Sequence, residues 1–466
     1  MEKNSKRGTF TGQIGFVLAA AGSAVGLGNI WRFPYLAAKD GGGVFLLCYI
    51  VLALTFGFTL LTTEIAIGRK TAQSPLTAYK KIHPRWGFLG VLASLVPVII
   101  LPYYCSIGGW VLKYLSVFVT GGGAQAAQDT YFKGYISGTW EPIVWMMVYL
   151  LLTAAVVYSG VEKGIEKFSK VLMPILLLLV VGISVFSLTL THTDASGVTR
   201  TGLEGLWIYL VPDFTGMTLG RFLMILMDAM GQLFFSISVA MGIMVAYGSY
   251  AKKETNLIKS INQIEIFDTL VALLAGMMIV PAVFTFTGTE AMSDGPGLMF
   301  KSLPKVFEAM GVAGGVIGAL FFLMVAFAAV TSSVSVMEAI VSSIMDRFHF
   351  SRKKSTVLVT LYAILLGTVV CLGYNLLYFD LTLPNGTVAQ ILDIMDYISN
   401  NCLMPLVALF TCVLVGWVVK PRTIIDEVTI GGYRFRRKTL YVVTIKIVAP
   451  ILLFVLLLQS FGLFRL

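Results

Sequence analysis

Long apolar stretches recur along the whole chain and limit the folds that it can adopt. Hydrophobic residues make up 57% of the 466 residues, and charged residues only 12%. A run of about 20 apolar residues crosses a bilayer as a helix, and in lipid only helices and closed barrels satisfy every backbone polar group. The sequence therefore predicts an all-α polytopic membrane protein.

Eleven spans are expected. They cover roughly residues 13–37, 44–69, 88–119, 141–159, 168–190, 222–250, 257–286, 314–346, 354–377, 388–418 and 439–463. Between the seventh and eighth spans, an amphipathic piece from Leu298 to Met310 either caps an outer vestibule or serves as a connector.

Basic residues, which give the chain a net charge of +10, are concentrated in every second loop. This bias marks the cytoplasmic side of a membrane protein, and it explains the charge better than binding to nucleic acid does. We expect a plasma (inner) membrane protein with its N-terminus in the cytoplasm and, after an odd number of spans, its C-terminus outside. Lys446 is the exception, because it lies inside the last span. The polar start of the chain is unlike a cleavable signal peptide.

The first span has a break near its middle. Gly22, Gly26 and Gly28 fall close together and are followed by Asn29 and Arg32. Glycine costs about 1 kcal/mol per helix position relative to alanine, and an intramembrane Arg needs a cavity and a partner. A small-residue packing face would explain the glycines but not the polar residues, so the stretch predicts an ion or substrate site.

The sixth span has a second break, between Gly231 and Gly242, with Ser236 and Ser238 inside it. Spans 1–5 and 6–10 then form two halves, each opening with an interrupted helix. Paired interruptions of this kind indicate an inverted-repeat transporter whose site lies between the breaks.

The eighth span carries four hydroxyl groups in five positions, from Thr331 to Ser335. A single Ser or Thr in a membrane helix usually donates its hydroxyl to a carbonyl of its own helix. Four such residues in five positions are more than this habit explains. Hydroxyl and freed carbonyl oxygens suit a hard cation, and the scarcity of carboxylates favours Na⁺ over Mg²⁺ or Ca²⁺. The three histidines and five cysteines are scattered, so no transition-metal site is expected.

These motifs together resemble those of the neurotransmitter:sodium symporters, specifically the bacterial, LeuT-like amino acid carriers with eleven spans. The likeness covers essentially the whole chain and rests on Gly22–Asn29, Trp31–Tyr35, Gly41–Gly43, Glu64, Gly68–Arg69, Tyr103–Tyr104, Gly231–Ser236 and Thr331–Ser333. It implies the LeuT fold, a 5+5 inverted repeat with helices 1 and 6 interrupted, plus an eleventh helix. The single transmembrane domain (1–466) would contain repeats at about 13–190 and 222–418 and the extra helix at about 439–463.

The resemblance implies two sodium sites. The first would be formed by the Ala24 carbonyl, Asn29, Ser236, Asp268 and the substrate carboxylate. The second would use the carbonyls of Gly22, Val25 and Ala328 and the hydroxyls of Thr331 and Ser332.

It also implies an amino acid site between the breaks. The substrate carboxylate would meet the Leu27 and Gly28 amides and the Tyr104 hydroxyl, and its ammonium the carbonyls of Ala24, Phe235 and Ser236. The side-chain pocket would be lined by Ile100, Tyr104, Phe235, Ser238, Met241, Ser332 and Val336. No charged side chain is among these, so a neutral, apolar amino acid, aliphatic or aromatic, is expected.

Two gates are implied. Arg32 with Asp396, bridged by Gln232, would close the outside, and Arg7 with Asp346, near Phe10 and Tyr250, would close the inside. Gly164 and Pro174 match a spacing with which the family unwinds its fifth span.

The chain departs from the family at two informative positions. Gly26 stands where monoamine carriers have an Asp, which favours an amino acid that brings its own carboxylate. Asp268 aligns where the family usually has an Asn ligand, with Ala272 one turn later, although an alignment error of one turn stays open. A fixed carboxylate there would make chloride unnecessary, and its pKa would decide whether a proton is counter-transported.

Sodium-coupled symport by alternating access is therefore the expected function, and a sodium-dependent amino acid sensor with the same site is the alternative. An enzyme would need a metal cluster, a phosphate loop or a nucleophile–base set, and a channel would need a continuous polar pore. The expected partners are the amino acid and the lipid bilayer, with no nucleic acid and no obligate protein partner.

Overall fold

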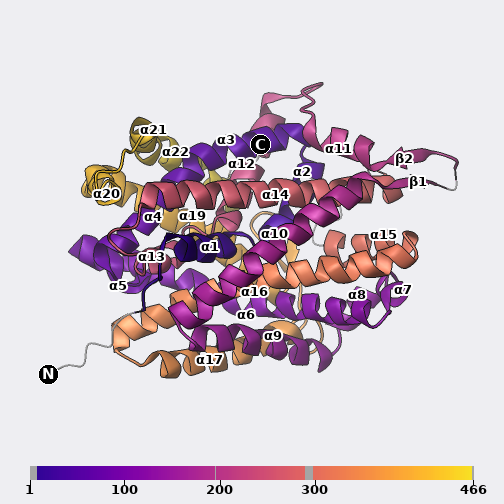
Figure 1. Ribbon diagram of the computed structural model, residues 1–466, viewed down its shortest axis with the longest axis horizontal. Coiled ribbons are helices and arrows are strands. Elements are labelled where there is room, and N and C mark those ends of the chain that lie inside the picture. The colour runs from indigo at the N-terminus through magenta and orange to yellow at the C-terminus, as the bar shows by residue number, and fades with distance from the viewer. Residues whose placement is uncertain (1–7, 195, 289–296, 464–466) are drawn as a thin grey trace.

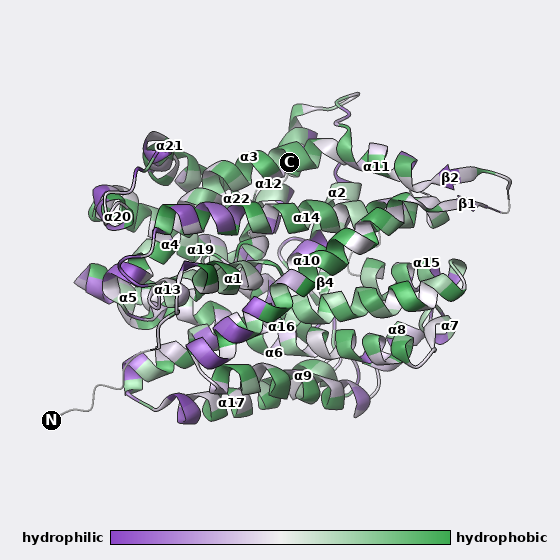
Figure 2. Ribbon diagram, in the orientation of Figure 1, coloured by the Kyte–Doolittle hydropathy of each residue, from purple (hydrophilic) through white to green (hydrophobic). Residues whose placement is uncertain are grey.

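The computed structural model describes residues 8–194, 196–288 and 297–463. Long helices run side by side in a bundle, and one small hairpin projects from one end of it (Figure 1). Apolar residues predominate along the middle of the bundle, and hydrophilic residues gather towards its ends (Figure 2). Ten helices among the described residues are long and apolar enough to cross a membrane, or eleven with one bent pair.

The helices of the spans match the expected ranges within a few residues, except that the fifth begins at Val161 and not near residue 168, and the ninth ends at Leu372 and not near residue 377. In order, the eleven consist of α1, η1 and α2 (Gln13–Ala24, Gly28–Arg32, Phe33–Lys39); α3, η2 and α4 (Gly43–Leu52, Ala53–Gly57, Phe58–Thr71); η3 and α6 (Pro84–Trp86, Gly87–Val119); α9 (Glu141–Tyr158); η4 and α10 (Val161–Glu166, Lys167–Leu188); α12 and α13 (Leu219–Ser236, Ile243–Gly248); α14 (Leu257–Thr287); α16 (Val312–Phe348); α17 (Arg352–Leu372); α18, η7, α19 and η8 (Ile391–Asp396, Tyr397–Leu403, Met404–Val413, Leu414–Val418); and α21, η9 and α22 (Lys438–Val443, Thr444–Val448, Ala449–Ser460).

The connections contain more regular structure than their polar composition suggests. They hold α5 (Pro75–Ile82), α7 (Gly123–Ala126), α8 (Tyr131–Ile136), α11 (Gly202–Leu210), η6 (Leu298–Ser302), α15 (Leu303–Ala309) and α20 (Arg422–Val428). Two antiparallel hairpins pair β1 (Thr191–Thr193) with β2 (Thr199–Thr201), and β3 (Leu381–Thr382) with β4 (Val388–Ala389).

Both expected breaks are present. The two halves of the first span are bent by 51° around the residues that follow Ala24. In the sixth span, the helix stops at Ser236 and resumes at Ile243, and Ser238, Ala240 and Gly242 have φ angles of 53°, 62° and 72°. The left-handed conformation is unfavourable for an alanine. Oε1 of buried Glu64 accepts a hydrogen bond of 2.6 Å from the Ala240 amide, which holds this backbone in place.

Candidate functional site

The two breaks meet the seventh span at a cluster of buried polar side chains. Asn29 follows the first break, Ser236 precedes the second and Asp268 lies on α14, and all three are fully buried. The Asn29 amide donates hydrogen bonds of 2.8 Å to Asp268 Oδ1 and 2.9 Å to Ser236 Oγ, and the Ser236 hydroxyl lies 2.9 Å from both Asp268 oxygens. The structure thus brings together these three residues of the expected first sodium site.

Tyr49 on α3 belongs to the same cluster, although the sequence analysis did not select it. Its hydroxyl lies 2.9 Å from Ser236 Oγ and 3.3 Å from Asp268 Oδ2. A lone tyrosine in an apolar span gives no local signal of such a role. The Asn29 oxygen accepts a hydrogen bond from the Gly26 amide inside the break, so Asn29 presents its NH2 group to the cluster, to which Ser236, Asp268 and Tyr49 contribute oxygen atoms.

The expected second sodium site lies where the first break contacts α16. The Thr331 hydroxyl lies 3.0 Å from the Ala328 carbonyl oxygen, and the Ser332 hydroxyl 3.4 Å from that of Val25. Gly22 lies beside α16, where an added Cβ would be in ordinary contact with Thr331 Cβ at 3.5 Å, and it lies closer to Met173 on α10. The Ser332 hydroxyl also lies 3.1 Å from the Ser23 carbonyl oxygen, which the sequence analysis did not include.

Between the breaks lies a small cavity of about 20 Å³. The residues that line it are Ser23, Ala24, Gly26, Leu27, Gly28, Ile100, Tyr104, Phe235, Ser238, Met241, Ser332 and Val336. All of the expected substrate residues are among them except Ser236, which faces Asp268. A side chain at position 26 would require Ser332 to move, because an added Cβ there would lie 2.4 Å from Ser332 Oγ. A cavity of this size holds about one water molecule.

A second cavity, of about 460 Å³, begins where the first one ends. Leu27, Gly28, Tyr104 and Phe235 line both cavities, so they separate the two. The larger cavity is rich in aromatic side chains, and η6 contributes Phe300 to its wall. The amphipathic segment therefore borders the larger cavity.

The expected outer gate residues lie at this larger cavity. Arg32 and Asp396 both line it, but no ion pair joins them among the described residues. Asp396 instead accepts a hydrogen bond of 2.6 Å from Asn400. Gln232 does not bridge the two charged residues, because its amide donates to the Gly28 carbonyl at 2.9 Å.

The segment that precedes α1 is anchored to the first and sixth spans. Phe10 is buried against Phe16, Tyr247 and Tyr250, and its amide donates to the Tyr250 carbonyl at 3.2 Å. Asp346 accepts a hydrogen bond of 2.6 Å from the Ser74 amide. The expected partner of Asp346, Arg7, lies outside the described residues.

A carboxylate that the sequence analysis did not select holds this segment. Glu166, at the end of η4, accepts hydrogen bonds from the Thr11 amide at 2.8 Å and from the Thr11 hydroxyl, and it pairs with Lys170 at 2.6 Å. Lys252 donates to the Thr11 carbonyl at 3.0 Å. Gly164 lies in the π-helical segment η4, and Pro174 lies inside α10.

Outside the spans, Asp40 joins the outer halves of the two broken helices. It follows α2 and accepts a hydrogen bond of 3.1 Å from Arg221 on α12, while Lys39 pairs with Asp228 on the same helix at 2.9 Å. The Asp40 side chain is only 1% exposed. Burial, together with the negative charge of Asp228, raises the pKa of Asp40 to about 7.

Comparison with known proteins agrees with this geometry. The sequence profile described as the Sodium:neurotransmitter symporter family matches residues 7–129 and 136–465. The crystal structure of MhsT in complex with L-phenylalanine superposes with a TM-score of 0.85 at 31% identity, over 98% of this chain and 100% of that chain.

Several relatives by sequence are sodium-dependent transporters. YhdH of Bacillus subtilis (strain 168), described as an uncharacterized sodium-dependent transporter, is 37% identical over 429 residues, or 90% of each chain. The human sodium- and chloride-dependent GABA transporter 2 is 28% identical over 488 residues, or 92% of this chain and 76% of that protein. The chain belongs to the sodium:neurotransmitter symporter family, with the LeuT fold, and is a sodium-dependent transporter rather than an enzyme.

Proposed function

We propose that the protein couples the inward Na⁺ gradient to the uptake of neutral, apolar L-amino acids, without a requirement for chloride. The observation that carries this proposal is the position of Asp268. A carboxylate hydrogen-bonded to Asn29 and Ser236, at the junction of both breaks, gives a cation a fixed negative charge. With Na⁺ bound, the Asn29 amide would turn its oxygen towards the ion.

The same carboxylate supports independence from chloride. An external anion is needed where nothing else offsets the charge of sodium in a desolvated site, and Asp268 already supplies that charge. The human GABA transporter 2 is described as chloride-dependent, whereas the description of YhdH names sodium alone. The proposed difference within the family therefore lies in which group brings the anion.

The lining of the small cavity supports the substrate class. Its side chains are apolar or carry only hydroxyl groups, so a second charge on the substrate would lack a partner. L-Phenylalanine is bound by MhsT, and Met241 can repack around side chains of different shape. Because the cavity is small here, Phe235 and Met241 would have to move outwards to admit an amino acid.

The two cavities support alternating access. The outer vestibule reaches the Tyr104–Phe235 pair, while the anchored Phe10 segment lies on the other side, as in a state that receives substrate from outside. We propose that Arg32 and Asp396 approach each other after binding and that the seal around Thr11 then opens. The N-terminus is proposed to be cytoplasmic and the C-terminus external, and two sodium ions to bind at the sites described above.

Uptake into proteoliposomes tests the proposal. Labelled amino acids would be offered under an inward Na⁺ gradient, with chloride present or replaced by gluconate. Concentrative uptake that needs sodium and ignores chloride is expected. Sodium-dependent binding without accumulation would favour the sensor, and a strict requirement for chloride would contradict the role of Asp268.

A further inference from the structure

We propose that Lys446 and Trp417 form a binding site for the phosphate of an anionic phospholipid, at the basic end of the bundle. Lys446 lies inside the last span, about 12 Å along the helix from Lys438. A cation within an apolar span is costly and needs a partner. Within the described part of the chain Lys446 forms no ion pair, and its ammonium nitrogen lies 6.0 Å from the centroid of the Trp417 ring.

The backbone around both residues is shaped to place them together. Trp417 lies in the π-helical segment η8, and Lys446 in the π-helical segment η9 of the neighbouring span. The segments approach closely at Gly416, where an added Cβ would lie 3.1 Å from the Ile445 carbonyl oxygen. The Trp417 indole donates a hydrogen bond of 3.2 Å to the Lys446 carbonyl.

The surroundings identify the occupant as a lipid. The Trp417 side chain is 63% exposed, and exposed Val443 and Ile447 flank Lys446 on the same span, so this surface faces hydrocarbon. A lysine extends its ammonium from such a position towards the headgroups, and tryptophan favours the same depth. An acyl chain would lie on Val443 and Ile447 while the phosphate meets Lys446.

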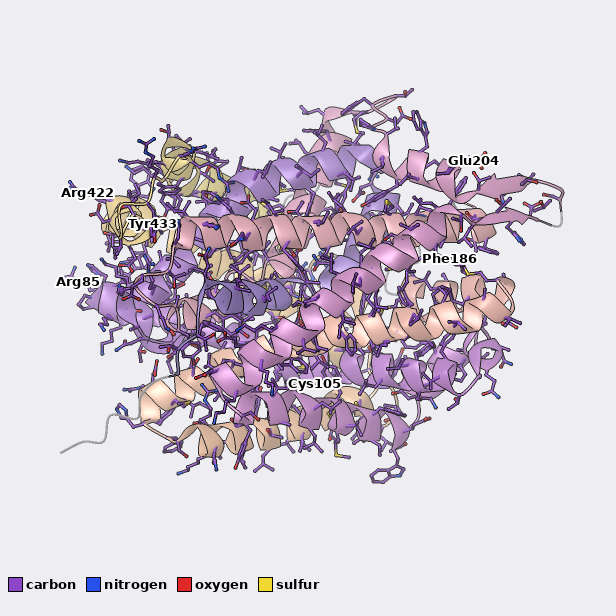
Figure 3. The ribbon with its side chains drawn as sticks, in the orientation of Figure 1. Arg85, Cys105, Phe186, Glu204, Arg422 and Tyr433 are labelled. Atoms are coloured by element: carbon purple, nitrogen blue, oxygen red, sulfur yellow. The ribbon has the colours of Figure 1, made fainter. Side chains whose placement is uncertain are left out.

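The charge at this end of the bundle selects an anionic lipid. Lys420, Arg434 and Arg436 are exposed in the adjoining loops, and Arg85 and Arg422 lie at the same end of the bundle, far from Glu204 (Figure 3). Basic residues near the surface of an anionic leaflet attract its headgroups without a specific contact. The Lys446–Trp417 site would add a direct contact with one phosphate group to this general attraction.

Native mass spectrometry of the purified full-length transporter tests the proposal. The protein in nonionic detergent would be titrated with dioctanoyl phosphatidylglycerol, with dioctanoyl phosphatidylcholine and inorganic phosphate as comparisons. We expect tighter binding of phosphatidylglycerol, by about fivefold or more. Lys446→Met should remove this preference and Lys446→Arg should keep it. Lys438→Met removes an exposed charge about two turns earlier on the same helix and should also keep it.

Three results would overturn the proposal: an unchanged preference in Lys446→Met, an equal loss in Lys438→Met, or displacement of the lipid by inorganic phosphate. The thermal midpoint of each variant would be measured in parallel. Phosphatidylglycerol should raise it for the wild type and Lys446→Arg more than for Lys446→Met. If Lys446→Met does not fold, Trp417→Ala replaces it, with a loss of preference again expected and an unchanged preference again contradicting the site.

Discussion

The side-chain amide of Asn29 donates a hydrogen bond of 2.8 Å to Asp268 Oδ1, which joins the break in the first span directly to the seventh span. Replacing Asp268 by Asn removes the fixed charge but keeps the size of the side chain. Because interactions of charged groups contribute about 1.5–3 kcal/mol, we expect sodium affinity to fall about tenfold or more and chloride to restore part of it. Sodium titrations of uptake with and without chloride measure both effects. A variant that keeps its sodium affinity in gluconate would contradict the proposed site.

Thr331 tests the second sodium site. Thr331→Val removes a hydroxyl oxygen with little change in shape, and sodium affinity should fall about tenfold. Thr285→Val is the matched control, because Thr285 is also buried and its hydroxyl returns to the Pro281 carbonyl four residues earlier. The control should titrate like the wild type. Equal effects in the two variants would point to a general loss of packing.

Asp396 tests the outer gate. If its pairing with Arg32 belongs to the closed state, Asp396→Asn should slow uptake about tenfold or more and leave sodium-dependent substrate binding nearly unchanged. Asp393→Asn is the control, since Asp393 lines the same cavity but its carboxylate caps α18 at Gln390. Uptake and equilibrium binding would be measured on the same preparations. A parallel loss of binding would assign Asp396 to the substrate site.

Glu166 tests the inner seal. Glu166→Gln weakens the hold on Thr11, so the inward-facing side should open more often. A thiol introduced by Ser335→Cys, on α16 beside Ser23, should then react several-fold faster with a membrane-impermeant reagent applied from the cytoplasmic side. Glu162→Gln changes an exposed residue of the same π-helical segment and should have no effect. Unchanged labelling in Glu166→Gln would show that Glu166 does not control access from the cytoplasmic side.

The buried carboxyl of Asp40 should make the stability of the protein depend on pH. Because the pKa of Asp40 is raised to about 7 in the folded protein, the folded state binds a proton more tightly than the unfolded chain does. The stabilising contribution of protonated Asp40 is therefore complete below about pH 4 and is lost as the pH rises through 7. Asp40→Asn should therefore gain thermal stability relative to the wild type between pH 5 and 8. Melting curves of the wild type and Asp40→Asn across that range measure the difference in melting temperature. A difference that does not change with pH would contradict the raised pKa of Asp40.

The sequence predicted the breaks because their causes are local. The glycines of the first span and the small and hydroxyl residues of the sixth lower helix propensity where they stand, and the structure interrupts both helices there. The residues that meet across the breaks followed only from the family resemblance. Their proximity depends on the packing of spans that are more than 200 residues apart in the chain.

Other contacts left no trace in the sequence. Glu166 and Thr11 are 155 residues apart, and nothing near either residue indicates the other. Tyr49 has ordinary aromatic neighbours, so its hydrogen bond with Ser236 depends on how α3 lies beside α12. The short helices α7, α8 and α11 lie in segments whose Gly and Thr content predicts loops, and packing against the bundle compensates for their weak propensity.

The two sides of the small cavity are bounded by different kinds of structure. On the vestibule side the barrier consists of the side chains of Leu27, Tyr104 and Phe235 and the backbone at Gly28. On the other side, the segment before α1 is held to the fifth span by the contact of Thr11 with Glu166 and to the sixth span by the packing of Phe10. Opening that side would require these contacts to break. Side chains therefore close the vestibule side and an anchored backbone segment lies on the other side, so opening the two sides requires different kinds of movement.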